Sequence, residues 1–235
     1  MKKSEVITLL KENQNERGLK HWATFKNTGG LKSFGIGLTQ LRKLAKQVGR
    51  NRELAIELWE TDNYDAKTIA LLIDDPKKIT REQAEKQVEE LGAGMLIHVF
   101  SSCDATLAKS PLALELAVEW LATNHDSKRR CGYGLLYELS KNKRNKALTD
   151  DFFLSCINDI NDRIFDMYET PTMRGSMAGA LMGIGKRNKI LNLRAIEVAT
   201  AVGPVDFNED DSKCEPLDIL KHLTSDYIKK KFAAN

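Results

Sequence analysis

The sequence PLALELAVEWLATNHDSKRRCGYGLLYELSK at residues 111–141 decides the fold, because it predicts two helices joined by a tight turn. Pro111 suits the first turn of a helix, where its missing N–H is not needed. The apolar residues that follow recur on one helical face: Leu114, Ala117, Val118 and Leu121. Asn124 and His125 break this pattern, and Asp126 is a suitable N-cap for the next helix. The stretch therefore predicts a helical hairpin.

The second helix of this hairpin has two chemically different faces. One face carries a stripe of small and apolar residues: Gly132, Leu135, Leu136 and Leu139. At about 100° per residue, the opposite face carries basic and aromatic residues: Arg130, Tyr133, Tyr137 and Lys141. We expect such a helix to pack against a core on one side and to face an anionic partner on the other.

The hairpin is repeated along the chain. ELAIE at 53–57 matches ELAVE at 115–119, and after one slipped residue DAK at 65–67 matches DSK at 126–128. A weaker third copy ends at 172–174. Helix signals occur from end to end and strand signals are few. Recurring helical hairpins predict an all-α, HEAT-like α-solenoid of stacked antiparallel pairs with a concave face, a single domain over 1–235. A non-repetitive helical bundle stays open as the alternative.

Composition narrows the function classes. The 235 residues are 29% charged and 42% hydrophobic, and the apolar runs are too short to span a membrane. The polar beginning of the chain predicts a cytoplasmic protein. Residues 1–50 hold 11 Lys/Arg against 3 Asp/Glu, whereas residues 51–100 hold 6 against 11. This uneven charge predicts a polarised surface, or only scatter among solvated helix faces.

Cysteine and histidine are dispersed, so metal chemistry is not expected. The cysteines are Cys103, Cys131, Cys156 and Cys214, and the histidines are His21, His98, His125 and His222. These spacings lack the close pairs that zinc sites use. We therefore expect free thiols, no metal and no cofactor.

Several motifs, taken in order, resemble a known family. They are GIG at 35–37, LRKLAK at 41–46, LAIELW at 54–59, Tyr64 with the apolar helix after it, Met173-Arg174 and Ala180-Leu181. They resemble the bacterial DNA alkylation repair family, the HEAT-like-repeat alkylpurine DNA glycosylases. The resemblance implies a superhelix whose concave face holds duplex DNA. It also implies an enzyme that excises cationic alkylated purines without flipping the damaged base.

The chain departs from that family where the chemistry is expected. The family pattern has two Trp before an Asp and a catalytic Asp three residues later, whereas residues 102–107 read SCDATL. Leu107 stands in the place of the catalytic carboxylate, and Gly179 replaces a further Trp. A carboxylate can stabilise the positive charge that develops on the sugar, and leucine cannot. Asp104 is a weak catalytic candidate, or an ordinary surface or turn-capping residue, so the glycosylase activity is left open.

Basic residues persist, and they predict a nucleic-acid surface. Arg129 or Arg130 falls where the family has an Arg facing the DNA. The predicted DNA-binding residues are Lys128, Arg129, Arg130, Tyr133, Tyr137, Lys141, Arg174, Lys186 and Arg187. The basic loop over 141–146 would extend this track. The alternatives are a solvated helix face, or a HEAT-like scaffold that binds another protein; oligomeric state is left open.

The helix predicted over 172–185 carries two glycines a turn apart, Gly175 and Gly179. Their missing side chains allow close approach, either of a DNA backbone or of a neighbouring helix. Helix packing is the use we expect.

Overall fold

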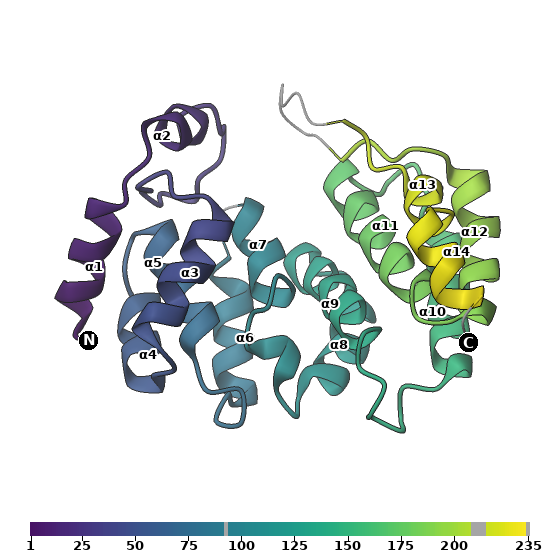
Figure 1. Cartoon of the computed structure of the whole chain (residues 1–235), viewed down its shortest axis with the longest axis horizontal. Coiled ribbons are helices and arrows are strands. Elements are labelled where there is room, and N and C mark those ends of the chain that lie inside the picture. The colour runs from purple at the N-terminus through teal and green to yellow at the C-terminus, as the bar shows by residue number, and fades with distance from the viewer. Residues whose placement is uncertain (92–93, 208–214, 234–235) are drawn as a thin grey trace. The chain divides into compact units, whose positions relative to one another are not determined.

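The computed structural model describes residues 1–91, 94–207 and 215–233, and in these residues the regular elements are all helical (Figure 1). The β-structure in this part of the chain consists of two isolated bridges, Lys32 with Asn63 and Val205 with Leu217. The described residues contain no helix that is long and apolar enough to cross a membrane. The chain divides into two compact units, residues 1–113 and 114–235, and each is described by itself.

Unit 1 is built from paired helices in chain order. Its helices are α1 (Lys3–Glu12), α2 (Glu16–Trp22), α3 (Leu38–Val48), α4 (Arg52–Trp59), α5 (Tyr64–Ile73), α6 (Arg81–Glu89), α7 (Gly94–Ser101) and the 3₁₀ helix η1 (Leu107–Lys109). Helix α5 lies at the centre, where it packs against α3, α4 and α7. Asp65 on α5 is fully buried, and its carboxylate accepts hydrogen bonds from Phe34 N (2.6 Å) and Ser33 Oγ (2.8 Å). The buried carboxylate therefore holds the loop that leads into α3.

Unit 2 contains the second helix of the hairpin at 111–141. Its helices are α8 (Ala113–Leu121, whose first residue belongs to unit 1), α9 (Asp126–Leu139), α10 (Asp150–Arg163), α11 (Pro171–Gly185), α12 (Lys189–Val202), α13 (Ile219–Leu223) and α14 (Asp226–Ala233). The bounds of α8 and α9 confirm the predicted pair of helices. Helix α11 packs against both α9 and α12, and α13 contacts α11 and α12.

Side-chain caps begin most of these helices at the residues that the sequence favours. Asn51, Asn63, Thr149 and Thr170 each accept a hydrogen bond from a backbone N–H in the first turn that follows. The predicted cap of α9 is wrong by one residue. His125 holds the extended conformation, and its Nδ1 accepts from Lys128 N at 3.4 Å. Asp126 is instead the first helical residue.

The face predicted for Tyr133 is also wrong. Its side chain is 1% exposed, in the core that Leu135, Leu136 and Leu139 form on the same helix. Tyr133 lies one turn before Tyr137, yet the buried arc of α9 is wide enough to include it. Burial raises the pKa of Tyr133 to about 12, and the carboxylate of Asp159 adds to this shift.

Candidate nucleic-acid interface

The predicted DNA-binding residues all belong to unit 2, on or beside α9 and α11. These two helices run in the same direction. At their N-terminal ends the Arg129 guanidinium on α9 pairs with the carboxylate of Glu169, two residues before α11. At their C-terminal ends an added Cβ on Gly183 of α11 would lie 2.5 Å from Cδ2 of Tyr137 on α9. The missing side chain of Gly183 therefore lets the helices approach closely.

Arg129 is committed to its carboxylate partner. The side chains of Arg129 and Glu169 are 12% and 13% exposed. Burial lowers the pKa of Arg129, but the hydrogen bond and charge of Glu169 outweigh it, so that the pKa is raised. The pair thus joins α9 to the segment before α11 and offers little free charge to a phosphate.

Arg130 and Arg174 are likewise held by neighbours. Arg130 is 14% exposed and lies 3.6 Å from the Asp126 carboxylate, one turn back on α9. Arg174 Nη2 donates to the carbonyl of Asp166 at 2.9 Å. The Nε atoms of both arginines are buried without a hydrogen-bond partner. Lys128, half-buried in the first turn of α9, is the remaining predicted cation at this end.

Arg187 serves the structure rather than the predicted DNA track. Its guanidinium donates to the carbonyls of Ser140 (2.9 Å), Asn142 (2.8 Å) and Leu148 (2.9 Å). It also lies 4.9 Å from the centre of the Phe153 ring. The last carbonyls of a helix have no partner within the helix, so this guanidinium closes the C-terminal end of α9. Its donors are therefore occupied by the protein.

The C-terminal ends of α9 and α11 bring four lysines together, which we call the lysine cluster: Lys141, Lys143, Lys186 and Lys231. Lys231 Nζ on α14 donates to the carbonyl of Lys186 at 2.6 Å. Burial lowers the pKa of Lys186, and the positive charges of Lys141 and Lys231 lower it further. Burial and then Lys143 lower the pKa of Lys231. The ammonium group of Lys186 is therefore repelled by those of Lys141 and Lys231, and that of Lys231 also by Lys143, which makes this surface electropositive.

The carboxylate of Glu138 partly neutralises the positive charge of the lysine cluster. Lys141 Nζ lies 2.9 Å from Glu138 Oε1 and 4.2 Å above the ring of Tyr137. The negative ends of the α9 and α11 dipoles also favour cations here. Tyr137 is half-buried, so its ring supports Lys141 rather than standing free.

The sequence pointed to Lys141 and Lys186 but missed Lys231, which lies 45 residues beyond Lys186. The run Lys229-Lys230-Lys231 in an amphipathic helix was the available signal. Only the packing of unit 2 shows that this helix ends beside α11.

An apolar loop marks the other end of α11. Between α10 and α11, the side chains of Phe165, Met167 and Tyr168 are 56%, 80% and 87% exposed. Three large, solvent-exposed apolar side chains within four residues are typical of a surface that contacts a partner. The loop adjoins Arg174 through the bond to Asp166.

The glycines of α11 differ in use. An added Cβ on Gly175 would lie 2.5 Å from Cβ of Phe207, in the segment after α12, so this glycine allows close approach of a loop and not of the neighbouring helix that was predicted. An added Cβ on Gly179 would meet nothing within 4 Å. Gly179 therefore leaves open space on α11 and does not serve helix packing.

The two residues that the family resemblance predicts at the catalytic position, Asp104 and Leu107, lie in unit 1. Leu107 begins η1 and is 2% exposed, so its apolar side chain lies in the core. The carboxylate of Asp104 is 64% exposed and lies 3.4 Å from Arg42 Nε on α3. This ion pair gives Asp104 a structural partner.

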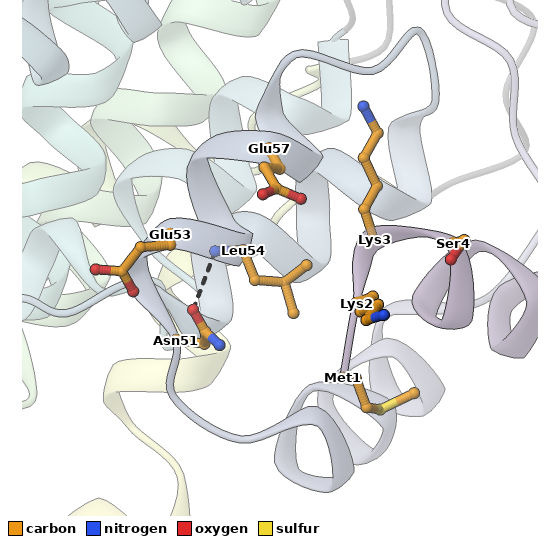
Figure 2. Close-up of a pocket in the computed structure, with 8 residues that line it drawn as sticks. All are labelled: Met1, Lys2, Lys3, Ser4, Asn51, Glu53, Leu54 and Glu57. Atoms are coloured by element: carbon orange, nitrogen blue, oxygen red, sulfur yellow. Dashed lines mark hydrogen bonds between the residues drawn. The ribbon is translucent and has the colours of Figure 1, made fainter.

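A separate hollow in unit 1 does not involve these residues. It has a volume of about 370 Å³ and lies between the start of α1 and α4, and its lining includes Lys2 and Lys3 from one side and Glu53 and Glu57 from the other (Figure 2). Its amide side chain, Asn51, is used to cap α4 by accepting from Leu54 N at 3.0 Å. The hollow is lined by side chains of both charges and by the apolar side chains of Met1 and Leu54. The described part of the chain also contains no group of three His, Cys, Asp or Glu that could hold a metal ion.

Comparisons with known proteins agree with this fold. A family model described as DNA alkylation repair enzyme matches residues 6–207. An uncharacterized protein of Listeria monocytogenes serovar 1/2a is 26% identical over 229 residues, which cover 93% of this chain and 94% of that protein. An uncharacterized protein of Listeria innocua serovar 6a is 26% identical over 227 residues, with the same coverage of both chains.

A solved structure is similar over almost the whole chain. It is described as "A new family of proteins related to the HEAT-like repeat DNA glycosylases with affinity for branched DNA structures". The TM-score is 0.82 at 23% identity, covering 99% of this chain and 96% of that chain. This likeness confirms the predicted all-α, HEAT-like architecture and excludes the non-repetitive bundle.

Proposed function

This chain belongs to the DNA alkylation repair enzyme family, and we propose that it binds DNA through the lysine cluster without excising alkylated bases. The observation that carries the proposal is the crowding of Lys141, Lys143, Lys186 and Lys231 at one end of unit 2. Cations that repel one another in the free protein gain most when a phosphate comes between them. Release of the counterions that DNA holds adds to this gain.

The exposed loop at 165–168 supports a preference for DNA with unpaired or unstacked bases. Aromatic and apolar side chains can stack on bases that a junction or a break leaves accessible. The solved relative with affinity for branched DNA structures is consistent with such a partner. A regular duplex hides these base faces, so duplex DNA would engage the lysine cluster alone.

The replaced catalytic position supports binding without excision. Cleavage of an N-glycosidic bond requires a group that stabilises positive charge on the sugar. Leu107 is buried and apolar, and Asp104 is paired with Arg42. Neither residue supplies the fixed, available carboxylate that this chemistry needs.

The test measures binding of the full chain to fluorescent DNA by anisotropy. Probes are a four-way junction and a linear duplex of the same base composition. We expect Lys141→Ala/Lys186→Ala to weaken binding to both probes at least tenfold. The matched control, Lys77→Ala/Lys78→Ala, removes two exposed lysines of unit 1 and should change affinity less than twofold.

The loop variant separates branch preference from phosphate binding. Met167→Ser/Tyr168→Ser should weaken junction binding about fivefold while leaving duplex binding unchanged, because stacking on a base contributes about 1–3 kcal/mol. An equal loss on both probes would show that the loop does not read unpaired bases. An unchanged affinity of the lysine variant would overturn the proposed interface.

Excision is tested separately on duplexes that carry methylated purines. We expect no abasic product from the purified chain. Product formation that Asp104→Asn abolishes would instead identify Asp104 as the working carboxylate.

A protein-binding scaffold is the second candidate, and one observation favours it. Ile190 and Leu193, a turn apart on α12, are 61% and 57% exposed. Binding through such residues would depend little on salt, whereas DNA binding through lysines weakens steeply as salt rises. The salt dependence of any interaction that is found therefore separates the two functions.

A further inference from the structure

A cysteine, a histidine and a serine meet where α7 ends in unit 1. His98 Nε2 lies 3.0 Å from Cys103 Sγ. His98 Nδ1, the other ring nitrogen, lies 3.2 Å from Ser102 Oγ. The three side chains thus form a chain in which the imidazole stands between a thiol and a hydroxyl. This is the arrangement of nucleophile, base and orienting group that covalent catalysis uses.

The hydrogen bonds of Ser102 determine which imidazole nitrogen is the base. A serine hydroxyl has one proton, and Ser102 Oγ lies 2.6 Å from the carbonyl of His98, its shortest acceptor. Because the Ser102 hydroxyl donates its proton to this carbonyl, its oxygen can only accept a hydrogen bond from the His98 ring, and the donor is Nδ1–H. The Nε2 lone pair then faces the thiol of Cys103 and can take its proton. Ser102 is therefore a positioning residue.

An uncommon backbone conformation places the thiol against this ring. Cys103 and Asp104 have φ angles of 57° and 69°. These values lie in the left-handed region, which residues other than glycine rarely adopt. Arg42 stabilises the turn from α3, because its Nε donates to the Cys103 carbonyl at 3.3 Å and contacts Asp104 at 3.4 Å. Side chains of this turn are accessible: Cys103 is partly exposed and His98 is exposed.

We propose that Cys103 is a nucleophilic thiol, activated by His98 and oriented through Ser102, that accepts an alkyl group from an electrophilic carbon compound. In the reaction His98 Nε2 takes the thiol proton, and the thiolate sulfur attacks the carbon. A sulfur–carbon bond forms as the bond to the leaving group breaks, and the leaving group departs with the electron pair. The products are a thioether on Cys103 and a protonated His98, so no oxidant or reductant is required.

The charged and titratable groups around the thiol come from several elements. Among the described residues they include Arg42 on α3, Tyr64 on α5, Asp104 beside the cysteine, and Lys109 of η1, whose Nζ donates to the Asp104 carbonyl at 3.0 Å. Burial raises the pKa of Tyr64 to about 12, so its ring is neutral at physiological pH. Arg42 and Lys109 add positive charge close to a forming thiolate.

The chain contains its own comparison thiol. Burial raises the pKa of Cys156 to about 12, with a further contribution from Asp159, so this thiol stays protonated and slow to react. Cys131 is fully buried. Cys214 lies outside the described residues and is replaced in the test protein by Cys214→Ser.

The test follows alkylation of each cysteine in the folded full chain by iodoacetamide, with peptide mass spectrometry as the readout. We expect Cys103 to react at neutral pH at least tenfold faster than Cys156 and faster than free glutathione. His98→Gln, which keeps hydrogen-bonding capacity without a base, should slow Cys103 about tenfold. At alkaline pH, where the thiol ionises unaided, this difference should disappear.

The pH profile identifies the role of Ser102. Ser102→Ala should slow alkylation about threefold at neutral pH and leave the rate at alkaline pH unchanged, which a loss of folding would not do. Thermal unfolding midpoints confirm that each variant is folded, and His98→Asn gives a second test if His98→Gln is unstable. A Cys103 rate equal to that of glutathione, or insensitive to His98, would overturn the proposal. Loss of the thiol to hydrogen peroxide but not to iodoacetamide would overturn the substrate class.

Discussion

Arg129 and Glu169 show how a residue expected to face DNA can instead serve the fold. The family resemblance predicted that Arg129 or Arg130 faces DNA, but the carboxylate of Glu169, 40 residues further along the chain, neutralises Arg129. The ion pair is mostly buried, and Tyr133 lies beside it in the core. The presence of an arginine in a sequence therefore does not show whether its charge is available to a ligand or is neutralised by another residue of the protein.

Removing this arginine is expected to destabilise unit 2. Arg129→Ala leaves the Glu169 carboxylate mostly buried without its partner, which should cost about 2–3 kcal/mol of unfolding free energy. Urea denaturation measures the loss. Arg163→Ala breaks a pair with Asp159 whose side chains are 42% and 45% exposed, and it should cost no more than about 0.5 kcal/mol. Equal losses in the two variants would contradict a structural role for Arg129.

Two buried tyrosines predict a loss of stability at alkaline pH. Burial raises the pKa of both Tyr64 and Tyr133 to about 12 from the ordinary value of 10.0. In the unfolded chain the hydroxyls release their protons near the ordinary value, so the unfolded state binds fewer protons between pH 10 and 12. Stability present below this range is therefore lost as the pH rises through it, by up to about 2–3 kcal/mol per tyrosine.

Denaturation at increasing pH checks this effect. Cys156, whose pKa burial raises from 9.0 to about 12, contributes in the same direction from a lower starting pH. Tyr133→Phe should flatten the alkaline limb of the stability curve. Tyr227→Phe, at a side chain that is 73% exposed, should leave it unchanged. An unaltered slope in Tyr133→Phe would count against burial of that hydroxyl.

At the scale of the element, two glycines of α11 lie in different surroundings, and only one of them is needed for packing against α9. Gly183 allows close approach to α9, whereas Gly179 faces open space on the same helix. Both glycines weaken the helix by comparison with alanine. The two positions therefore give opposite predictions for the same substitution.

Gly183→Ala should destabilise the protein by about 1–3 kcal/mol, because the new methyl group would lie 2.5 Å from Cδ2 and 3.1 Å from Cα of Tyr137. The Cα atom is backbone and cannot move aside by rotation. Gly179→Ala should instead stabilise the protein by up to about 1 kcal/mol through helix propensity. Thermal unfolding of the two variants side by side measures both effects. A stabilising Gly183→Ala would show that α9 and α11 are less closely packed.

At the scale of the whole molecule, the proposed DNA surface belongs to one of the two compact units, unit 2. The lysine cluster joins residues from the end of α9, the end of α11 and α14. A concave face formed by the whole chain stays a prediction. The proposed surface does not require it, because every lysine of the cluster lies within one unit.

The salt dependence of DNA binding tests the contribution of the four lysines of the cluster together. Each phosphate contact contributes about 0.9 to the slope of log affinity against log salt concentration. Four lysines predict a slope of roughly −3 to −4, and Lys141→Ala/Lys186→Ala should reduce its magnitude by about 2. Anisotropy titrations of the full chain at several salt concentrations give the slope. A slope that the double substitution leaves unchanged would place the phosphate contacts elsewhere.

The sequence by itself determined the helical architecture and the two helices within residues 111–141. Helical periodicity, caps and repeats are local signals, so they can be recognised without coordinates. Only the tertiary structure decided that Arg129, Arg187 and Tyr133 serve packing, and that Lys231 joins Lys141 and Lys186. Those outcomes depend on residues that are far apart in the sequence, such as Arg187 and Ser140, which are 47 positions apart. The periodicity of one helix does not show which residues another element will place beside it.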